Sequence, residues 1–238
     1  MNFSPSEPWV LPIASEQQVI HEQGDDWLFD RVCGPSPDIR TELAARGFVF
    51  RDRPQRRILR ELLRNAGGLM AITPRLKIAV ESSVGKIILL RAPPAFDISH
   101  SEPRWPHTIF ISVPGRPSEV SALRAAENII HEAMHLQLTI LEQAAPLIAD
   151  GVATMASPWR KEPRHFQGVM HGFYVFRCIA AFFSALSLSG FLNAEGIDHI
   201  RQRRAQIAEE LSRLDYDRLA QGMTPRGRAF LAALICVP

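Results

Sequence analysis

Two histidines and a glutamate stand at the spacing of a metal-binding helix. The segment His131-Glu132-Ala133-Met134-His135 has the pattern HExxH. Residues four apart lie one turn apart on the same helical face, so both imidazoles can bind a single metal ion. Glu132 would then lie beside a ligand or water on that metal. The pattern makes an enzyme with a metal centre the leading hypothesis.

The sequence around this motif predicts a long and mostly buried helix. Residues 118–143 read SEVSALRAAENIIHEAMHLQLTILEQ, and Ser118 can cap the first turn. A wide apolar surface is formed by Ile129, Ile130, Ala133, Met134, Leu138 and Leu141. The alternative interpretation is a pair of ordinary helix histidines. Burial argues against it, because buried imidazoles need partners and a metal satisfies both rings together.

A metal held by HExxH needs a third protein ligand from another segment. The compact HExxHxxGxxH motif is excluded, because Leu138 and Leu141 occupy the positions of its Gly and third His. The downstream candidates are Asp150, Glu162, Glu195, His165, His171 and His199. No carboxylate stands in a helical ExxxD pattern, whereas His171 begins an apolar helix. We therefore expect His131, His135 and His171 to bind the metal.

The elements that must position these residues predict an α+β fold. Helices are expected at 37–46, 55–65 (ending at Gly67-Gly68), 170–188, 196–221 and 225–235. Strands are expected at 77–82, 86–91 and 108–113, and a long loop at 144–170. We expect a mainly helical single domain with a small antiparallel sheet backing a zincin-like HExxH helix. An edge strand of such a sheet can hold an extended peptide.

We expect residues 1–238 to form one catalytic domain with three portions. They are a helical N-terminal portion (1–75), a portion with the strands, the metal helix and the third-ligand helix (76–190), and C-terminal helices (191–238).

Bulk properties narrow the function class. A net charge of +2 gives no case for a nucleic-acid binder. The cysteines Cys33, Cys178 and Cys236 lack CxxC spacing, so they predict neither a disulfide framework nor a Cys-based zinc site. The N-terminus lacks the features of a signal peptide, and the apolar stretch 169–192 is interrupted by polar side chains. We expect a cytoplasmic protein with no membrane partner, and its oligomeric state stays open.

The segment downstream of the metal helix resembles a known family. Residues 157–176 read SPWRKEPRHFQGVMHGFYVF, and residues 97–114 read DISHSEPRWPHTIFISVP. Together with HEAMH they are similar to the HEXXH-motif family linked to modification of ribosomally made peptides. This resemblance covers roughly residues 95–180. It implies an Fe(II) centre, with 2-oxoglutarate and O₂ as cosubstrates, that hydroxylates a side-chain β-carbon of a precursor peptide.

Such an oxygenase needs open metal positions and a cation for its cosubstrate. Three protein ligands leave room for 2-oxoglutarate and O₂, although the usual set has two histidines and one carboxylate. The distal carboxylate of 2-oxoglutarate needs a cation, and Arg160 and Arg164 lie between the two ligand segments. Arg177 is a further candidate. Glu132 is expected to serve catalysis by orienting a ligand or a histidine.

Two other function classes stay open. In a zinc hydrolase, Glu132 would act as general base on a metal-bound water that attacks a peptide carbonyl. A binding or regulatory protein with a vestigial site is the third class. An intact HExxH together with His171 argues against it. The resemblance of residues 157–176 leads us to expect the oxygenase.

Overall fold

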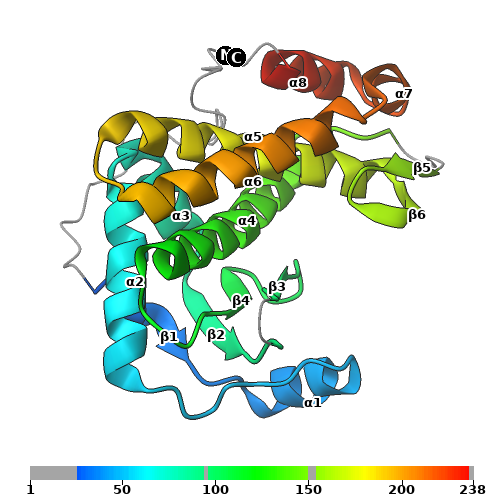
Figure 1. Ribbon diagram of the computed structural model, residues 1–238. Coiled ribbons are helices and arrows are strands. Elements are labelled where there is room, and N and C mark those ends of the chain that lie inside the picture. The colour runs from blue at the N-terminus through cyan, green and yellow to red at the C-terminus, as the bar shows by residue number, and fades with distance from the viewer. Residues whose placement is uncertain (1–25, 94–95, 150–153, 236–238) are drawn as a thin grey trace.

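A long buried helix, α4 (Glu119–Ala144), runs through the middle of the fold (Figure 1). The computed structural model describes residues 26–93, 96–149 and 154–235. Ser118 begins α4, because its Oγ accepts a hydrogen bond of 3.1 Å from the backbone N–H of Ser121. The predicted apolar residues of α4 are buried in the main hydrophobic core. The predicted helix and its start are therefore confirmed.

A four-stranded sheet packs against one side of α4 (Figure 1). Its order is β1 (Val32–Cys33), β2 (Lys86–Leu90), β4 (Thr108–Ser112) and β3 (Ser99–Ser101). The pairs β1–β2 and β2–β4 are parallel, while β3 runs antiparallel to β4. The expected small sheet is present, with mixed rather than wholly antiparallel pairing. Strand β3 lies at the end of this order, next to α4.

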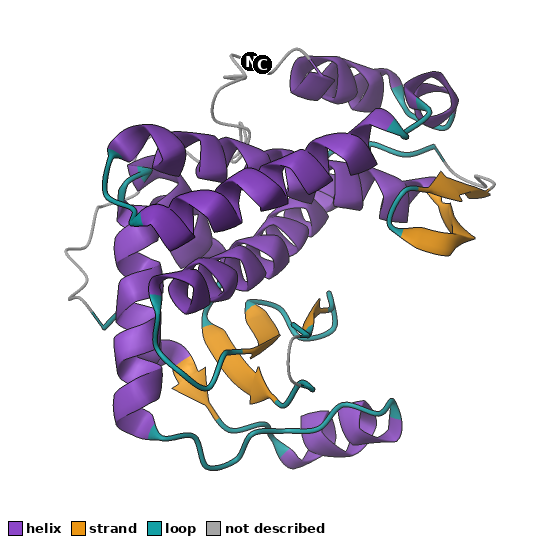
Figure 2. Ribbon diagram, viewed as in Figure 1, coloured by secondary structure: helices purple, strands orange, loops and turns teal. Residues whose placement is uncertain are grey.

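The two faces of the sheet bury different cores. Ile87 and Leu89 of β2 belong to the main core that contains α4. Ile88 and Leu90 alternate with them and pack in a smaller cluster with Leu43. Leu43 belongs to α1 (Pro37–Ala45), the helix on the far side of the sheet in Figure 2. This burial on both faces explains the continuous apolar run of β2.

Helices cover the remaining sides of α4. Its neighbours are α2 (Arg56–Ala71), α3 (Pro74–Ser83), α5 (Phe166–Ser189) and α6 (Ala194–Ser212). Two shorter helices, α7 (Tyr216–Gln221) and α8 (Pro225–Ile235), follow α6. By length and composition α5 could cross a membrane, but most of its apolar stretch is buried inside the fold. It is a core helix, as predicted. The fold is a mainly helical domain with a small sheet, which confirms the predicted class.

Two predictions about the N-terminal half were wrong. The strand expected at 77–82 lies within α3, which begins with Pro74 at its first turn. The helix expected to end at Gly67-Gly68 continues through both glycines to Ala71. A Cβ at Gly67 would lie 2.9 Å from Trp27 Nε1, so this glycine serves close packing and not helix termination.

The C-terminal half also differs from expectation in two places. Part of the loop expected at 144–170 forms a hairpin of β5 (Thr154–Ser157) and β6 (Arg160–His165). The helix expected at 196–221 is divided into α6 and α7. Asp215 caps α7 by accepting a hydrogen bond of 2.8 Å from the backbone N–H of Arg218. An Asp side chain favours such a cap over the helix interior.

Candidate active site

His131 and His135 bring two ring nitrogens together on α4. Their Nε2 atoms are 3.2 Å apart, and the ring planes are inclined by 64°. This separation suits two imidazole nitrogens that each lie about 2.1 Å from one shared ion. The pair therefore fits two neighbouring positions on one divalent metal.

Both imidazoles are neutral at physiological pH. Burial lowers the pKa of His131 to about 4, and the nearby charge of Arg203 adds to the effect. Burial lowers the pKa of His135 to about 3, and repulsion from His131 adds to it. Metal ligands must be deprotonated, so the site favours binding of a cation over binding of a proton.

Glu132 is fixed between the metal helix and the edge strand. Its side chain is buried, with 3% of the residue exposed. Oε2 accepts a hydrogen bond of 2.6 Å from Ser101 Oγ, and Oε1 lies 4.0 Å from His131 Nε2. Ser101 was not predicted, because no strand was expected between 86–91 and 108–113. Its place in a strand beside α4 is what brings it to Glu132.

His171 lies beside His135, as expected, but on the other side of that ring. Its Nδ1 is 3.3 Å from His135 Nδ1, while His135 Nε2 faces His131. His171 Nε2 is 2.8 Å from Glu142 Oε2. Among the described residues, no three His, Cys, Asp or Glu side chains form a ready metal-ligand group. The ligand role of His171 stays a prediction.

Sequence reasoning missed Glu142. It lies seven residues, or about two helical turns, after His135 on α4. Following the histidine face of the helix would have found it. The carboxylates considered from the sequence, Glu162, Glu195 and Asp150, all lie downstream of α4. Of these, Glu162 and Glu195 do not line the cavity with the histidines, and Asp150 lies outside the described residues.

A cavity of about 700 Å³ opens onto the histidines. It is lined from four elements, and Arg160 and Arg164 of β6 share it with His131, His135 and His171. Neither of these two arginines makes an ion pair with an acidic residue in the described part of the chain. Burial lowers the pKa of Arg164, and repulsion from Arg160 adds to this. Two neighbouring cations without acidic partners make this side of the cavity suited to an anion.

Two glycines let the hairpin approach α5. A Cβ at Gly172 would lie 2.8 Å from Trp159 Cζ3, and one at Gly168 would lie 3.1 Å from Arg164 Nη2. Trp159 also stacks on Phe176, with ring centroids 5.2 Å apart. A side chain at Gly172 would collide with the hairpin and one at Gly168 would crowd it, so both glycines favour this close approach. It places the arginines of β6 over the start of α5.

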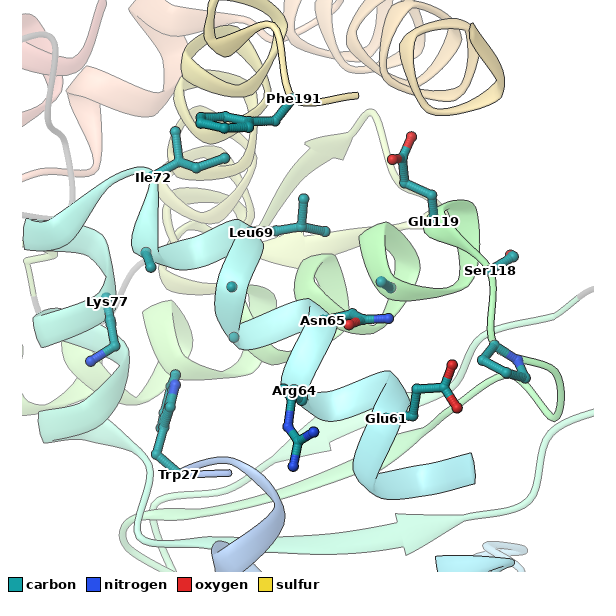
Figure 3. Close-up of a pocket in the computed structure, with 15 residues that line it drawn as sticks. Trp27, Glu61, Arg64, Asn65, Leu69, Ile72, Lys77, Ser118, Glu119 and Phe191 are labelled. Atoms are coloured by element: carbon teal, nitrogen blue, oxygen red, sulfur yellow. The ribbon is translucent and has the colours of Figure 1, made fainter. Parts of the chain in front are cut away.

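The remaining sequence candidates lie elsewhere. Arg177 lines a separate hollow between α5 and α6, and His165 and His199 do not line the cavity with the histidine pair. Another cavity of about 680 Å³ runs along α2, between Trp27 and Glu119 (Figure 3). No histidine or cysteine is among the described residues that line it. The metal chemistry expected from the sequence thus belongs to the cavity on α4.

Comparison with known proteins adds no assignment. No protein-family model matches the chain, and no curated protein sequence matches it.

Proposed function

We propose that this protein is a cytoplasmic Fe(II)- and 2-oxoglutarate-dependent dioxygenase that hydroxylates a side-chain β-carbon of a ribosomally made peptide. One observation carries the proposal. Arg160 and Arg164 open into the same cavity as His131 and His135, and no described acidic residue pairs with them. Cleavage of an internal peptide bond needs no anion site beside the metal, whereas 2-oxoglutarate brings a distal carboxylate that must be paired.

Each residue of the candidate site has a role in the proposed function. His131 and His135 bind the metal through their Nε2 atoms. Iron held there would supply the activation of O₂ coupled to oxidation of 2-oxoglutarate. Arg160 and Arg164 hold the distal carboxylate of the cosubstrate and fix its orientation. Glu132, held by Ser101, accepts a hydrogen bond from a group at the metal and keeps it in place.

The edge strand supports a peptide as the substrate. Ser99 and Ser101 line the cavity from β3, whose outer edge pairs with no described strand. Ile98 O accepts a bond from Ser112 N–H in β4, so by alternation the backbone groups of Ser99 and Ser101 face away from the sheet. An extended peptide can add to this edge beside the metal site.

Anaerobic reconstitution with Fe(II) tests the proposal. Addition of 2-oxoglutarate should produce a metal-to-cosubstrate charge-transfer band, and O₂ with a peptide should then release succinate. Arg160→Ala and Arg164→Ala should each weaken 2-oxoglutarate binding about tenfold or more while Fe(II) content persists. Lys161→Ala is the matched control, because Lys161 lies on the same strand but does not line the cavity. Unchanged cosubstrate binding in both arginine variants would contradict the assignment.

A zinc hydrolase is the second candidate function. The position of Glu132 favours it, because Oε1 lies 4.0 Å from His131 Nε2 in the place of a general base. This function predicts zinc-dependent cleavage of peptides without O₂ or 2-oxoglutarate. Cleavage should be lost in Glu132→Gln.

A further inference from the structure

The rings of His135 and His171 contact each other edge to edge rather than face to face. Their ring planes are inclined by only 18°, their centroids are 5.5 Å apart, and their Nδ1 atoms are 3.3 Å apart. The centroids are farther apart than the nitrogens by about the width of one ring. Each Nδ1 therefore points along the line between the ring centres. This is the arrangement of an N–H···N hydrogen bond in the plane of both rings.

Glu142 fixes the hydrogen on the far side of His171. Glu142 Oε2 lies 2.8 Å from His171 Nε2 and accepts a bond of the same length from Gln167 Nε2. A carboxylate oxygen accepts, so His171 donates to it from Nε2. With one hydrogen on its ring, the Nδ1 of His171 is bare. The side chains of His171 and Glu142 are only 12% and 10% exposed, so water competes little for these groups.

The tautomer of His135 follows from the tautomer of His171. His171 Nδ1 has no hydrogen, so His135 must donate from its own Nδ1. A neutral imidazole carries one hydrogen, and His135 Nε2 is then bare. This bare nitrogen is the one that lies 3.2 Å from His131 Nε2, where the metal is expected.

We propose that Glu142 and His171 form a positioning relay that holds His135 in the tautomer with Nε2 free to bind the metal. His171 is then a positioning residue and not the third protein ligand, which differs from the role expected from the sequence. The relay rests on the proposed function only in taking His131 and His135 as metal ligands. A carboxylate–histidine contact behind a metal ligand fixes its orientation and raises its basicity.

The helices make the relay possible. His135 and Glu142 lie about two turns apart on α4, and Gln167 and His171 lie one turn apart on α5. The α4 and α5 helices pack against each other, so the two pairs face across one interface. Any shift of α5 along α4 would separate His171 from both partners. The relay thus ties the metal ligand to the packing of the two helices.

Histidine ¹⁵N NMR of the metal-free protein tests the tautomers directly. Long-range ¹H–¹⁵N spectra should show a hydrogen on Nε2 of His171 and on Nδ1 of His135. Glu142→Ala should abolish the single tautomer of His171 and shift the His135 signals. Glu142→Gln, which keeps the shape and can still accept, should change them less. Gln143→Ala is the matched control, since Gln143 is exposed on the same turn. The opposite tautomer at His135, or no change in Glu142→Ala, would overturn the relay.

Co(II) titration followed by visible absorption tests the consequence for the metal. Glu142→Ala should weaken Co(II) binding about tenfold or more, with absorption bands of unchanged shape. His171→Asn keeps an acceptor near Nδ1 and should bind Co(II) more tightly than His171→Ala. Equal losses in these two variants, with altered bands, would make His171 a ligand and overturn the relay. If the wild type has the expected tautomers and binds Co(II), but the Fe(II) protein shows no response to 2-oxoglutarate, the proposed function fails while the relay stands.

Discussion

At the residue scale, burial decides the protonation state of His131 and His135 before any metal binds. The pKa values of about 4 and about 3 keep both rings neutral well below the pH at which free histidine takes a proton. The same burial keeps water from the two facing Nε2 atoms, and a shared cation would satisfy both of them. Desolvation thus keeps both rings in the form that binds a metal, and their protonation state can be measured in the metal-free protein.

We expect the metal-free protein to lose stability between pH 7 and pH 5. The unfolded chain takes up protons at these histidines near pH 6.5, whereas the folded chain does not until about pH 4. The unfolded state binds more protons in this window, so the free energy of unfolding falls as pH falls. The expected loss is about 3 kcal/mol for both histidines together, after allowance for the 26% exposure of the His131 side chain.

Urea unfolding at the two pH values measures this loss. A variant with His131→Gln and His135→Gln lacks both titrating groups, so its stability should depend on pH less by about the same amount. An equal pH dependence in the variant and the wild type would show that the two rings are not kept neutral by the fold.

At the element scale, the two adjacent glycines of α2 have different roles. Gly67 is buried against Trp27, while a Cβ at Gly68 would meet nothing within 4 Å. We expect Gly68→Ala to raise the free energy of unfolding by about 0.5–1 kcal/mol, because glycine is costly inside a helix. Gly67→Ala should lower it, since Trp27 must move. Thermal unfolding of both variants measures the contrast, and equal effects would show that Trp27 does not pack on α2 as described.

Elements with strong local signals were predictable, and elements decided by packing were not. The Ser118 cap and the apolar surface of α4 specify that helix within a turn. Residues 77–82 were expected to be a strand because their local pattern does not separate a short strand from a helix, and α3 is settled by its packing on α4. Strand β6 reads RKEPRH and is almost entirely exposed, so no apolar alternation marks it. It forms because β5 pairs with it.

At the scale of the whole molecule, the candidate site is assembled from segments far apart in sequence. Strand β3, helix α4, the β5–β6 hairpin and α5 all contribute to its cavity. Three of the predicted histidines and two of the predicted arginines lie around one cavity: His131, His135, His171, Arg160 and Arg164. Ser101 and Glu142 were not, because their roles depend on how β3 and α5 pack on α4. Spacing along the chain identifies candidate metal ligands. Their hydrogen-bond partners can be identified only once the packing of the elements is known.

One buried ion pair connects this site to the outer helix layer. Arg203 of α6 donates from Nε to Glu127 Oε1 of α4 at 2.6 Å, and the two side chains are only 21% and 13% exposed. Burial raises the pKa of Glu127 even though Arg203 lowers it. Arg203 also lies over the ring of Phe176, which contacts His131. The pair thus holds α6 against the helix that carries the histidines.

Arg203→Ala should lower the free energy of unfolding by about 3 kcal/mol, because it leaves the carboxylate of Glu127 buried without a partner. Adding Glu127→Leu should recover much of this loss, since the unpaired charge is then gone. Arg201→Ala is the control: Arg201 pairs with Asp198 on the surface of the same helix at 71% exposure, and its removal should cost less than about 1 kcal/mol. Urea unfolding compares all three variants. If Arg203→Ala costs no more than Arg201→Ala, the α4–α6 contact is not held by this pair.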